Sequence, residues 1–365
     1  MATSIFQNVP SGLGSRRKDF RVSGAELDKI ALEGVNWLIE KRGLGWPEDP
    51  NYCEENGFMK NADPEKVSKT AKDRGESQIG TLGSGNHFVE IQKIDKIFDT
   101  QTAKAFGLME PDQITVMIHT GSRGFGHQIC SDYLQVMERA IDKYKISLPD
   151  RELACAPASS NEAEDYYKAM ASAVNFAFSN RQAITHWVRQ SFEQAFHAQA
   201  DKMGLKVVYD VAHNIAKIEE HAVDGSIKKV IVHRKGATRA FPPEHPAIPS
   251  AYRSVGQPVI IPGSMGTSSW VMVGAPHAMD ITWGSTAHGA GRMLSRTMAK
   301  KSFWGNEVKK ELESRGMVVR AASSVVLAEE ADPAYKNVDE VVQVSHDLRI
   351  ATKVARLVPL AVIKG

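Results

Sequence analysis

Short apolar segments that lead directly into glycine-rich loops recur along this chain, and they constrain its fold more than any other feature. Residues 114–118 run into His119 and the loop GSRGFG, and residues 88–91 follow the turn GSGN. A third segment, residues 205–212, ends at His213, and residues 258–274 carry a Gly/Ser loop between two more apolar runs. Apolar and β-branched runs bounded by Gly and Ser predict β-strands.

Segments with helical signals lie between these strands. The clearest is residues 22–43, where Ser23 and Glu26 form a capping box and Gly43 suits the C-terminal cap. We expect further helices at residues 161–203 (as two helices), 293–303 and 338–352, and a final strand at 355–365. The span 45–74 is rich in Pro, Asp and Asn, which indicates irregular surface structure.

Helices and strands alternate without the regular rhythm of βαβ units. A length of 365 residues suits one large domain or two of ordinary size. We therefore predict an α+β fold with interleaved helices and strands, in one large domain or two of ordinary size.

Bulk properties exclude several classes of protein. The net charge of +2 gives no overall basic field that would by itself indicate nucleic-acid binding. Cys53, Cys130 and Cys155 follow no metal or redox spacing, which favours a reducing, cytoplasmic setting. No apolar run reaches transmembrane length, and the N-terminus lacks the features of a signal peptide. We therefore expect a cytoplasmic protein with no membrane partner.

Four histidines occupy similar positions at strand ends or in glycine-rich loops: His87, His119, His213 and His288. Neutral imidazole is a common metal ligand, so these side chains could converge on a metal ion. For any one of them, a hydrogen bond to the backbone is the simpler explanation. Because four histidines share this context, a metal site and simple hydrogen bonding become about equally favoured explanations.

The glycine-rich loops GSGN, GSRGFG, PGSMGTSS and HGAGR offer unobstructed backbone N–H groups, which bind phosphate oxygens. Arg123 and Arg292 could add charge to such a site. Tight turns that require glycine are the alternative for each loop. Their proximity to the histidines favours a nucleotide or polynucleotide phosphate site. In such a site, His288 could be a ligand, an acid/base group or a nucleophile.

Two single residues and one basic cluster have weaker signals. Glu90 could accept the two donors of a guanine edge, although a solvated strand residue is the commoner case. Lys364 is penultimate, and terminal lysines are usually solvated. The cluster HRKGATR at 233–239 could meet an RNA backbone or could simply be a hydrated surface.

Together, these motifs resemble those of the RtcB family of RNA-splicing ligases. The stretches that carry the resemblance, in the family's order, are LGSGNHFVEIQ, HTGSRGFGHQI, HNIAK, HRKGATRA, IIPGSMGTSS, HGAGRMLSRTMAKK and the terminal IKG. The resemblance implies an RtcB-like α+β fold with a mixed sheet and interleaved helices, in a single domain over residues 1–365. It also implies an RNA ligase that depends on GTP and on Mn²⁺, with two manganese ions in the family. Such enzymes join RNA 3′-phosphate or 2′,3′-cyclic phosphate ends to 5′-hydroxyl ends in tRNA splicing or RNA repair. An archease-type activator is a further implied partner.

The resemblance also implies roles for individual residues. His288 would be the nucleophile that takes GMP from GTP, and Arg123 would contact RNA. The implied metal ligands are His87, His119 and His213. The implied nucleotide-binding residues are Asn86, His87, Phe88, Val89, Glu90, His213, Asn214, Pro262, Gly263, Ser264, Met265, Ser269, His288, Gly289, Ala290, Gly291, Tyr335 and Lys364.

The chain departs from the family pattern in one respect. An upstream D-x-x-C-G motif, whose Asp and Cys complete the metal site in the family, has no counterpart in residues 1–365. The resemblance starts at VPSGLGS, which follows that motif in the family, so we expect the family fold without its N-terminal part. Two other functions stay open: a catalytically inactive remnant that binds nucleotide or RNA, and a metal-dependent phosphohydrolase.

Overall fold

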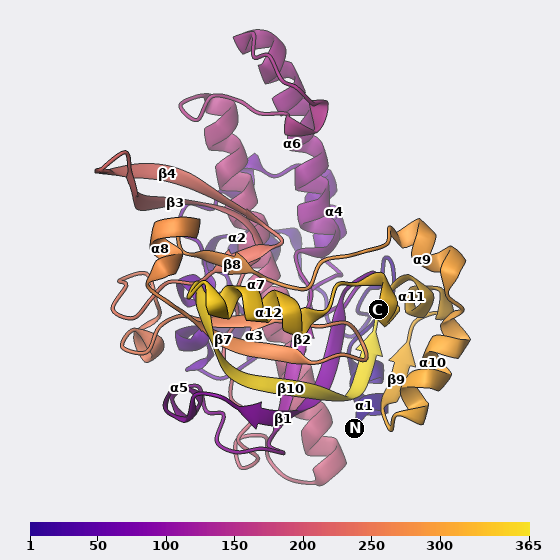
Figure 1. The fold of residues 1–365 in the computed structure, drawn as a ribbon. Helices are drawn as coiled ribbons and strands as arrows, with labels where there is room; N and C mark the ends of the chain where they lie inside the picture. Colours follow the sequence, from indigo (N-terminus) through magenta and orange to yellow (C-terminus); the bar gives the residue numbers. More distant parts are fainter.

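A computed structural model describes residues 1–365 of the chain (Figure 1). The helices are α1 (Ala2–Asn8), α2 (Gly24–Glu33), α3 (Val35–Arg42), α4 (Lys69–Gly75), α5 (Thr100–Ala105), α6 (Arg123–Tyr144), α7 (Asn161–Phe196), α8 (His277–Thr282), α9 (Arg296–Ser302), α10 (Gly305–Ser314), α11 (Ser324–Glu329) and α12 (Val338–Asp347). The strands are β1 (Phe88–Ile97), β2 (Ile114–His119), β3 (Asn214–Val223), β4 (Ser226–Lys235), β5 (Ala237–Arg239), β6 (Pro258–Ile261), β7 (Ser269–Gly274), β8 (Ser285–Ala287), β9 (Val318–Ala321) and β10 (Ala351–Lys364).

The main sheet has the strand order β2-β1-β10-β7-β6, and β9 pairs with the end of β10. All pairs are antiparallel except β9 with β10, so the predicted α+β fold with a mixed sheet is confirmed. The C-terminal strand β10 lies at the centre, with β1 along one edge and β7 and β9 along the other. The last residues of the chain therefore lie inside the sheet.

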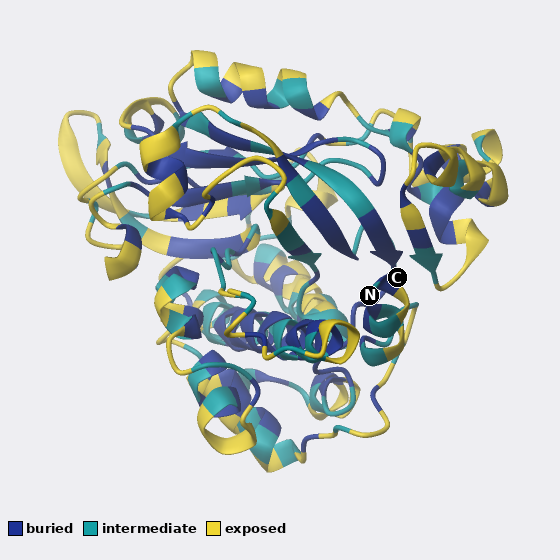
Figure 2. Ribbon diagram, turned by 90° about the horizontal axis from the view of Figure 1, so that it is seen from below, coloured by how far each residue is buried: buried dark blue, intermediate teal, exposed yellow.

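Helices cover both faces of this sheet (Figure 2). On one side, α1, α2, α6 and α7 enclose the largest hydrophobic cluster, which includes Leu27, Phe176 and, from β1, Val89. On the other side, α12 packs over β6 and β7 through Val338 and Val342. Alternate residues of a strand face opposite sides of the sheet, so β1 is buried on both faces.

Several predicted elements are confirmed. The capping box of Ser23 and Glu26 starts α2, and Gly43 ends α3 in the left-handed conformation with φ +66°. The helix expected over residues 22–43 is divided at Gly34, where a Cβ atom would lie 2.3 Å from the carbonyl oxygen of Gly57. The strands expected at 88–91, 114–118 and on both sides of the loop in 258–274 are also present, as β1, β2, β6 and β7.

The prediction of two helices in residues 161–203 is wrong, because α7 is one helix of 36 residues. Its sequence contains neither Gly nor Pro, and polar residues in its middle are buried rather than marking a break. Asn180, for example, accepts from the N–H of Gly80 at 2.7 Å. Buried polar side chains therefore connect α7 to neighbouring loops.

The prediction that residues 45–74 form irregular surface structure is wrong in part. The span includes α4 and three short 3₁₀ helices, and Asp49 is 1% exposed. Both oxygens of Asp49 pair with Arg189 of α7, at 2.7 and 2.8 Å. The polar composition reflects internal ion pairs as well as solvent exposure.

The expected strand at residues 205–212 is absent, and His213 precedes β3 instead of ending a strand. This segment pairs with a loop instead of a sheet. The N–H of Asp210 donates to the carbonyl of Tyr52 at 3.0 Å, and the N–H of Glu54 donates to the carbonyl of Asp210 at 2.8 Å. An apolar run extends into a ladder only where a neighbouring strand is available.

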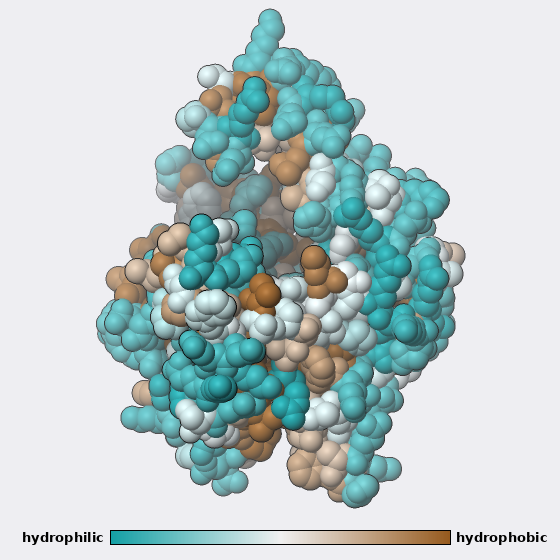
Figure 3. Space-filling model, turned by 90° about the vertical axis from the view of Figure 1, so that its right-hand side faces the viewer, coloured by the Kyte–Doolittle hydropathy of each residue, from teal (hydrophilic) through white to brown (hydrophobic).

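Two parts of the chain stand away from the main sheet. The β3–β4 hairpin projects on one side, and α9, α10 and α11 form a group on the opposite side (Figure 1). The face on the side of that group is mostly hydrophilic, with separated hydrophobic patches (Figure 3). None of the helices combines the length and apolar character needed to cross a bilayer.

Candidate active site

Three histidines from distant parts of the chain converge at one place. His119 is the last residue of β2, His213 lies directly before β3, and His288 follows β8. The Nε2 atoms of His119 and His213 are 3.4 Å apart, and the ring centroids of His213 and His288 are 3.9 Å apart. One nitrogen from each ring lies within 4.8 Å of the others, so the three imidazoles could share a metal ion.

Backbone contacts explain why His213 and His288 meet. The N–H of Gly236 donates to the carbonyl of His213 at 3.2 Å, and the N–H of His288 donates to the carbonyl of Gly236 at 3.3 Å. Gly236 has φ +66°, a conformation that favours glycine. The carboxylate of Glu54 accepts the N–H of Ala212 at 2.9 Å and so holds the segment before His213. Both histidines are therefore positioned by the main chain of one glycine.

His87 lies beside this group. Its ring centroid is 6.1 Å from that of His119, and its Nδ1 is 2.9 Å from the carbonyl oxygen of Leu82. A ring that donates its Nδ1–H to a carbonyl keeps Nε2 free as a ligand. The structure thus brings together His119, His213 and His288 as a possible ligand set, with the predicted ligand His87 next to them.

Burial keeps these imidazoles neutral near pH 7. It lowers the pKa of His87 to about 3, of His213 to about 2 and of His288 to about 4. It also lowers the pKa of His119 well below its usual value, and the neighbouring imidazoles act in the same direction. A neutral imidazole has the lone pair that a metal ligand or a nucleophile requires.

A cavity of about 160 Å³ adjoins His119 and His288. The predicted nucleotide-binding residues that line it are Asn86, Phe88, Glu90, Pro262, Gly263, Ser264, Met265, His288, Gly289, Ala290, Gly291, Tyr335 and Lys364. They come from the start of β1, the β6–β7 loop, the loop after β8, the segment before α12 and the end of β10. Strand pairing joins two of these segments, because Phe88 lies opposite Lys364 in the sheet.

Other predicted nucleotide-binding residues lie outside this cavity. Val89 belongs to the hydrophobic core, because it faces the opposite side of β1 from Phe88 and Glu90. Ser269 supports the β6–β7 loop, where its hydroxyl accepts the N–H of Gly263 at 3.2 Å. The remaining residues outside the cavity are His87, His213 and Asn214.

Comparison with known proteins shows the family of this chain. The sequence model of the RtcB family, described as tRNA-splicing ligase RtcB, matches residues 1–365. The chain belongs to the RtcB family. It is 55% identical to the tRNA-splicing ligase RtcB of Methanococcus maripaludis over 365 residues, which are 100% of this chain and 75% of that protein. The resemblance inferred from the sequence motifs is therefore confirmed.

Two further RtcB relatives show a similar identity but different lengths. The tRNA-splicing ligase RtcB of Thermococcus kodakarensis is 54% identical, and this chain covers 75% of it. The tRNA-splicing ligase RtcB of Pyrococcus abyssi is 55% identical, and this chain covers 40% of it. Both matches extend over 100% of this chain.

Besides the predicted metal ligand His119, the cavity of this RtcB-family chain has three lining residues that are not among the nucleotide-binding residues implied by the family resemblance: Arg292, Arg296 and Glu330. Glu330 is 2% exposed, and its carboxylate pairs with Arg292 at 3.0 Å and lies 3.7 Å from Nζ of Lys364. The hydroxyl of Tyr335 also donates to Glu330. The only local signal for Glu330 is its position four residues after the buried Val326, which places both on one side of a helical turn.

A buried carboxyl group and a buried amine face the cavity. Burial raises the pKa of Glu90 to about 8 and lowers the pKa of Lys364 to about 8. The side-chain amide of Gln92 donates to Glu90, and Ser269 accepts from the same amide at 3.0 Å. The penultimate lysine is thus not solvated, and both groups can change protonation state when a ligand enters.

The three histidines also border a larger, mainly apolar cavity of about 420 Å³. Its lining includes Met117, Val208, Tyr252 and Leu357. His119 and His288 line both cavities. The histidines therefore lie at the junction of a polar and a mainly apolar space.

Arg123, the predicted RNA contact, lines neither cavity. It is the first residue of α6, and its Nε donates to the hydroxyl of Thr81 at 3.2 Å. Gly83 leaves room for its guanidinium, since a Cβ atom there would lie 1.8 Å from Nη1. Burial lowers the pKa of Arg123 to about 10. Its contact with RNA stays a prediction.

Proposed function

We propose that this protein is a GTP- and manganese-dependent RNA ligase that joins RNA 3′-phosphate or 2′,3′-cyclic phosphate ends to 5′-hydroxyl ends through a histidine–GMP intermediate. The supporting observation is that His288 adjoins two features at once. It borders the glycine-lined cavity, and it lies within metal-ligand distance of His119 and His213. Membership in the RtcB family supports RNA as the partner, and we propose an archease-type activator as a second partner.

The donor set supports a divalent metal. Neutral imidazoles suit a divalent transition metal, so His119 and His213 would hold the ion while His288 stays available to attack, and manganese is the metal that the family resemblance implies. Bound there, a metal ion would polarise phosphoryl oxygens. His87, with Nδ1 directed to the carbonyl of Leu82, would be free to contribute Nε2.

The cavity lining suggests how GTP would lie. The carboxylate of Glu90 would accept the two donors of the guanine edge, with Lys364 beside it. Backbone N–H groups of residues 263–265 and 289–291 would contact the phosphates. Arg292, held by Glu330 and Tyr335, could add a charge-assisted contact.

In the first step, an imidazole nitrogen of His288 would attack the α-phosphorus of GTP. The N–P bond forms as the bond from phosphorus to the bridging oxygen breaks, and pyrophosphate leaves. The guanylyl group then passes to the RNA 3′-phosphate, and the 5′-hydroxyl attacks this activated end and releases GMP. His288 needs no base to begin, because burial keeps it neutral.

An RNA-joining assay tests this proposal. Two RNAs, one ending in 3′-phosphate and one beginning with 5′-hydroxyl, are incubated with the protein, GTP and Mn²⁺. We expect a joined product that is lost in His288→Ala and retained in His277→Ala, which changes an exposed histidine on α8. Release of phosphate without joining would favour a phosphohydrolase. Neither reaction in the folded protein would favour an inactive remnant.

A further inference from the structure

The β3–β4 hairpin is a regular two-stranded ribbon that projects from the body of the molecule (Figure 1). Its pairing runs without interruption from Asn214 opposite Lys235 to Val223 opposite Ser226. Successive side chains on each strand therefore alternate between two faces. The two faces have very different surroundings.

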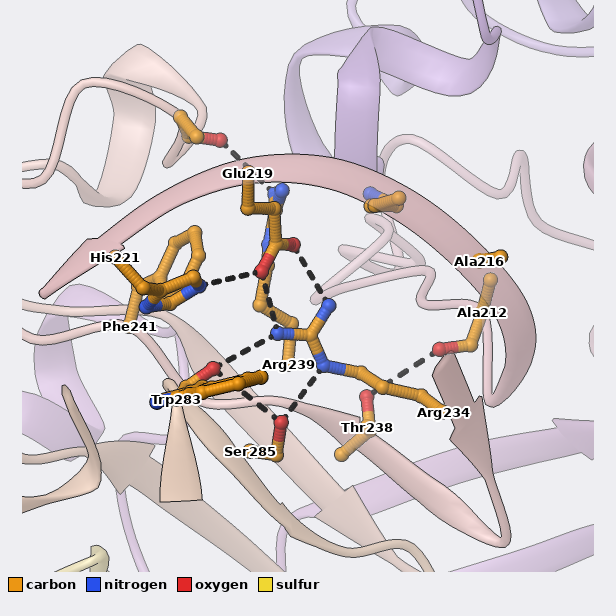
Figure 4. A network of polar contacts seen from close by, with 12 residues as sticks. Ala212, Ala216, Glu219, His221, Arg234, Thr238, Arg239, Phe241, Trp283 and Ser285 are labelled. Atoms are coloured by element: carbon orange, nitrogen blue, oxygen red, sulfur yellow. Dashed lines mark hydrogen bonds and ion pairs between the residues drawn. The ribbon is translucent and has the colours of Figure 1, made fainter. Parts of the chain in front are cut away.

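One face is fixed to β8 and to the segment before it by a buried polar network (Figure 4). Arg234 donates to both carboxylate oxygens of Glu219, at 2.7 and 2.9 Å, and His221 lies 3.0 Å from the same carboxylate. Arg234 also donates to the hydroxyl of Ser285 at 2.9 Å and to the carbonyl of Trp283 at 3.1 Å. Ser285 begins β8, the strand that precedes His288, so the ribbon and the proposed nucleophile are held together.

Most of the other face is open, although Ala216 on it is buried against α7. On β4 it carries Lys229, Ile231, His233 and Lys235, and on β3 it carries Asn214, Ile218 and Glu220, all of them exposed. Ile218 is 53% exposed and Ile231 is 38% exposed, although they lie directly opposite each other. Two exposed isoleucines side by side on one face of a ribbon indicate a contact surface for a partner.

Charge and position indicate which partner this face suits. Lys229 and Lys235 stand on it with one acidic residue, Glu220, so its charge favours an anionic ligand. Lys235 lies at its inner end, directly before Gly236, whose carbonyl accepts the N–H of His288 at 3.3 Å. Lys229 and Lys235 are six residues apart, about 20 Å along β4, so the two cations form a row that leads outward from the proposed nucleophile.

We propose that this open face of the β3–β4 ribbon binds the single-stranded 3′ end of the RNA substrate. Lys229 and Lys235 contact phosphates, and Ile218 and Ile231 contact the bases or riboses between them. The row of cations leads the 3′-phosphate to His288. This inference rests on the proposed function, because it takes RNA as the substrate.

The two neighbouring lysines of β4 offer a matched test. Lys228 is exposed like Lys229, but it belongs to the opposite face and already pairs with Asp224 at 3.2 Å. Binding of a fluorescent single-stranded RNA ending in 3′-phosphate is measured by anisotropy without GTP, over a range of salt concentrations. We expect Lys229→Ala to weaken binding about three- to tenfold and to reduce the salt slope by about one, as loss of one phosphate contact predicts.

Lys228→Ala is expected to leave the RNA affinity and the salt slope unchanged. Ile231→Ser is expected to weaken binding without changing the salt slope. Equal effects of Lys228→Ala and Lys229→Ala, or no effect of either, would overturn the proposal. Labelling of each variant by GTP separates this outcome from failure of the proposed function. A protein that forms the GMP adduct but binds RNA equally well in all variants contradicts only the ribbon site. A difference between the lysine variants without any adduct contradicts only the proposed ligase mechanism.

Discussion

The charge of Glu90 should depend on whether a nucleotide occupies the cavity that this residue lines. Burial raises its pKa to about 8, so the carboxyl group is mostly protonated at pH 7. Two donors from a guanine edge would favour the ionised form, because hydrogen bonds to a carboxylate lower its pKa. Binding of GTP should then release a proton from Glu90.

The resulting pH dependence has a definite sign. GTP affinity should rise from pH 6 towards pH 8, because ionisation of Glu90 becomes easier as the pH approaches its pKa. Above that, loss of the proton of Lys364, with a pKa of about 8, should reverse the trend. Calorimetry in two buffers of different ionisation enthalpy measures the released proton. Glu90→Gln should abolish the release and reduce the preference for GTP over ATP, and an unchanged proton count in this variant would rule out Glu90 as its source.

Among the helices and strands, the sequence correctly predicted those boundaries that capping residues and glycine-rich turns determine. The capping box of Ser23 and Glu26 marks a real helix start, and Gly/Ser loops mark the ends of β1, β2, β6 and β7. The failures have a common cause in tertiary pairing. Residues 205–212 pair with a loop, and the polar span 45–74 supplies Asp49 to a buried ion pair with α7.

That ion pair yields a stability prediction. Asp49→Ala leaves the guanidinium of Arg189 buried without its partner, which should cost about 3–5 kcal/mol of unfolding free energy. Asp73→Ala removes an exposed partner of Lys69 and should cost much less, because solvent screens this surface pair. Urea denaturation of both variants measures the difference. Similar losses in the two variants would show that the Asp49–Arg189 pair does not anchor α7.

At the scale of the whole molecule, the candidate site depends on contacts that no local pattern contains. The motifs predicted that His119, His213 and His288 are functional, but β2, the loop before β3 and the loop after β8 meet only in the folded chain. Glu330 was not predictable for the same reason, because it is buried against Arg292 from the loop after β8 and Lys364 from β10. The family resemblance alone indicated a role for Lys364, the penultimate residue. Its burial follows from the central position of β10 in the sheet.

This convergence predicts that a metal ion stabilises the whole fold. A ligand at one hundred times its dissociation constant adds about 2.7 kcal/mol to the unfolding free energy. Mn²⁺ should therefore raise the thermal midpoint of the wild-type protein, and His119→Ala and His213→Ala should abolish most of this increase. His277→Ala serves as the control on the exposed surface. An increase of the same size in all four proteins would place the metal elsewhere.

Detection of the GMP adduct on His288 tests the proposed ligase mechanism without any intermediate inference. The protein is incubated with radiolabelled GTP and Mn²⁺, and the labelled peptide is identified by mass spectrometry before and after acid treatment. We predict one GMP group on His288, labile to acid, lost in His288→Ala and retained in His277→Ala. An adduct that persists in His288→Ala, or that maps to another residue, would contradict the account.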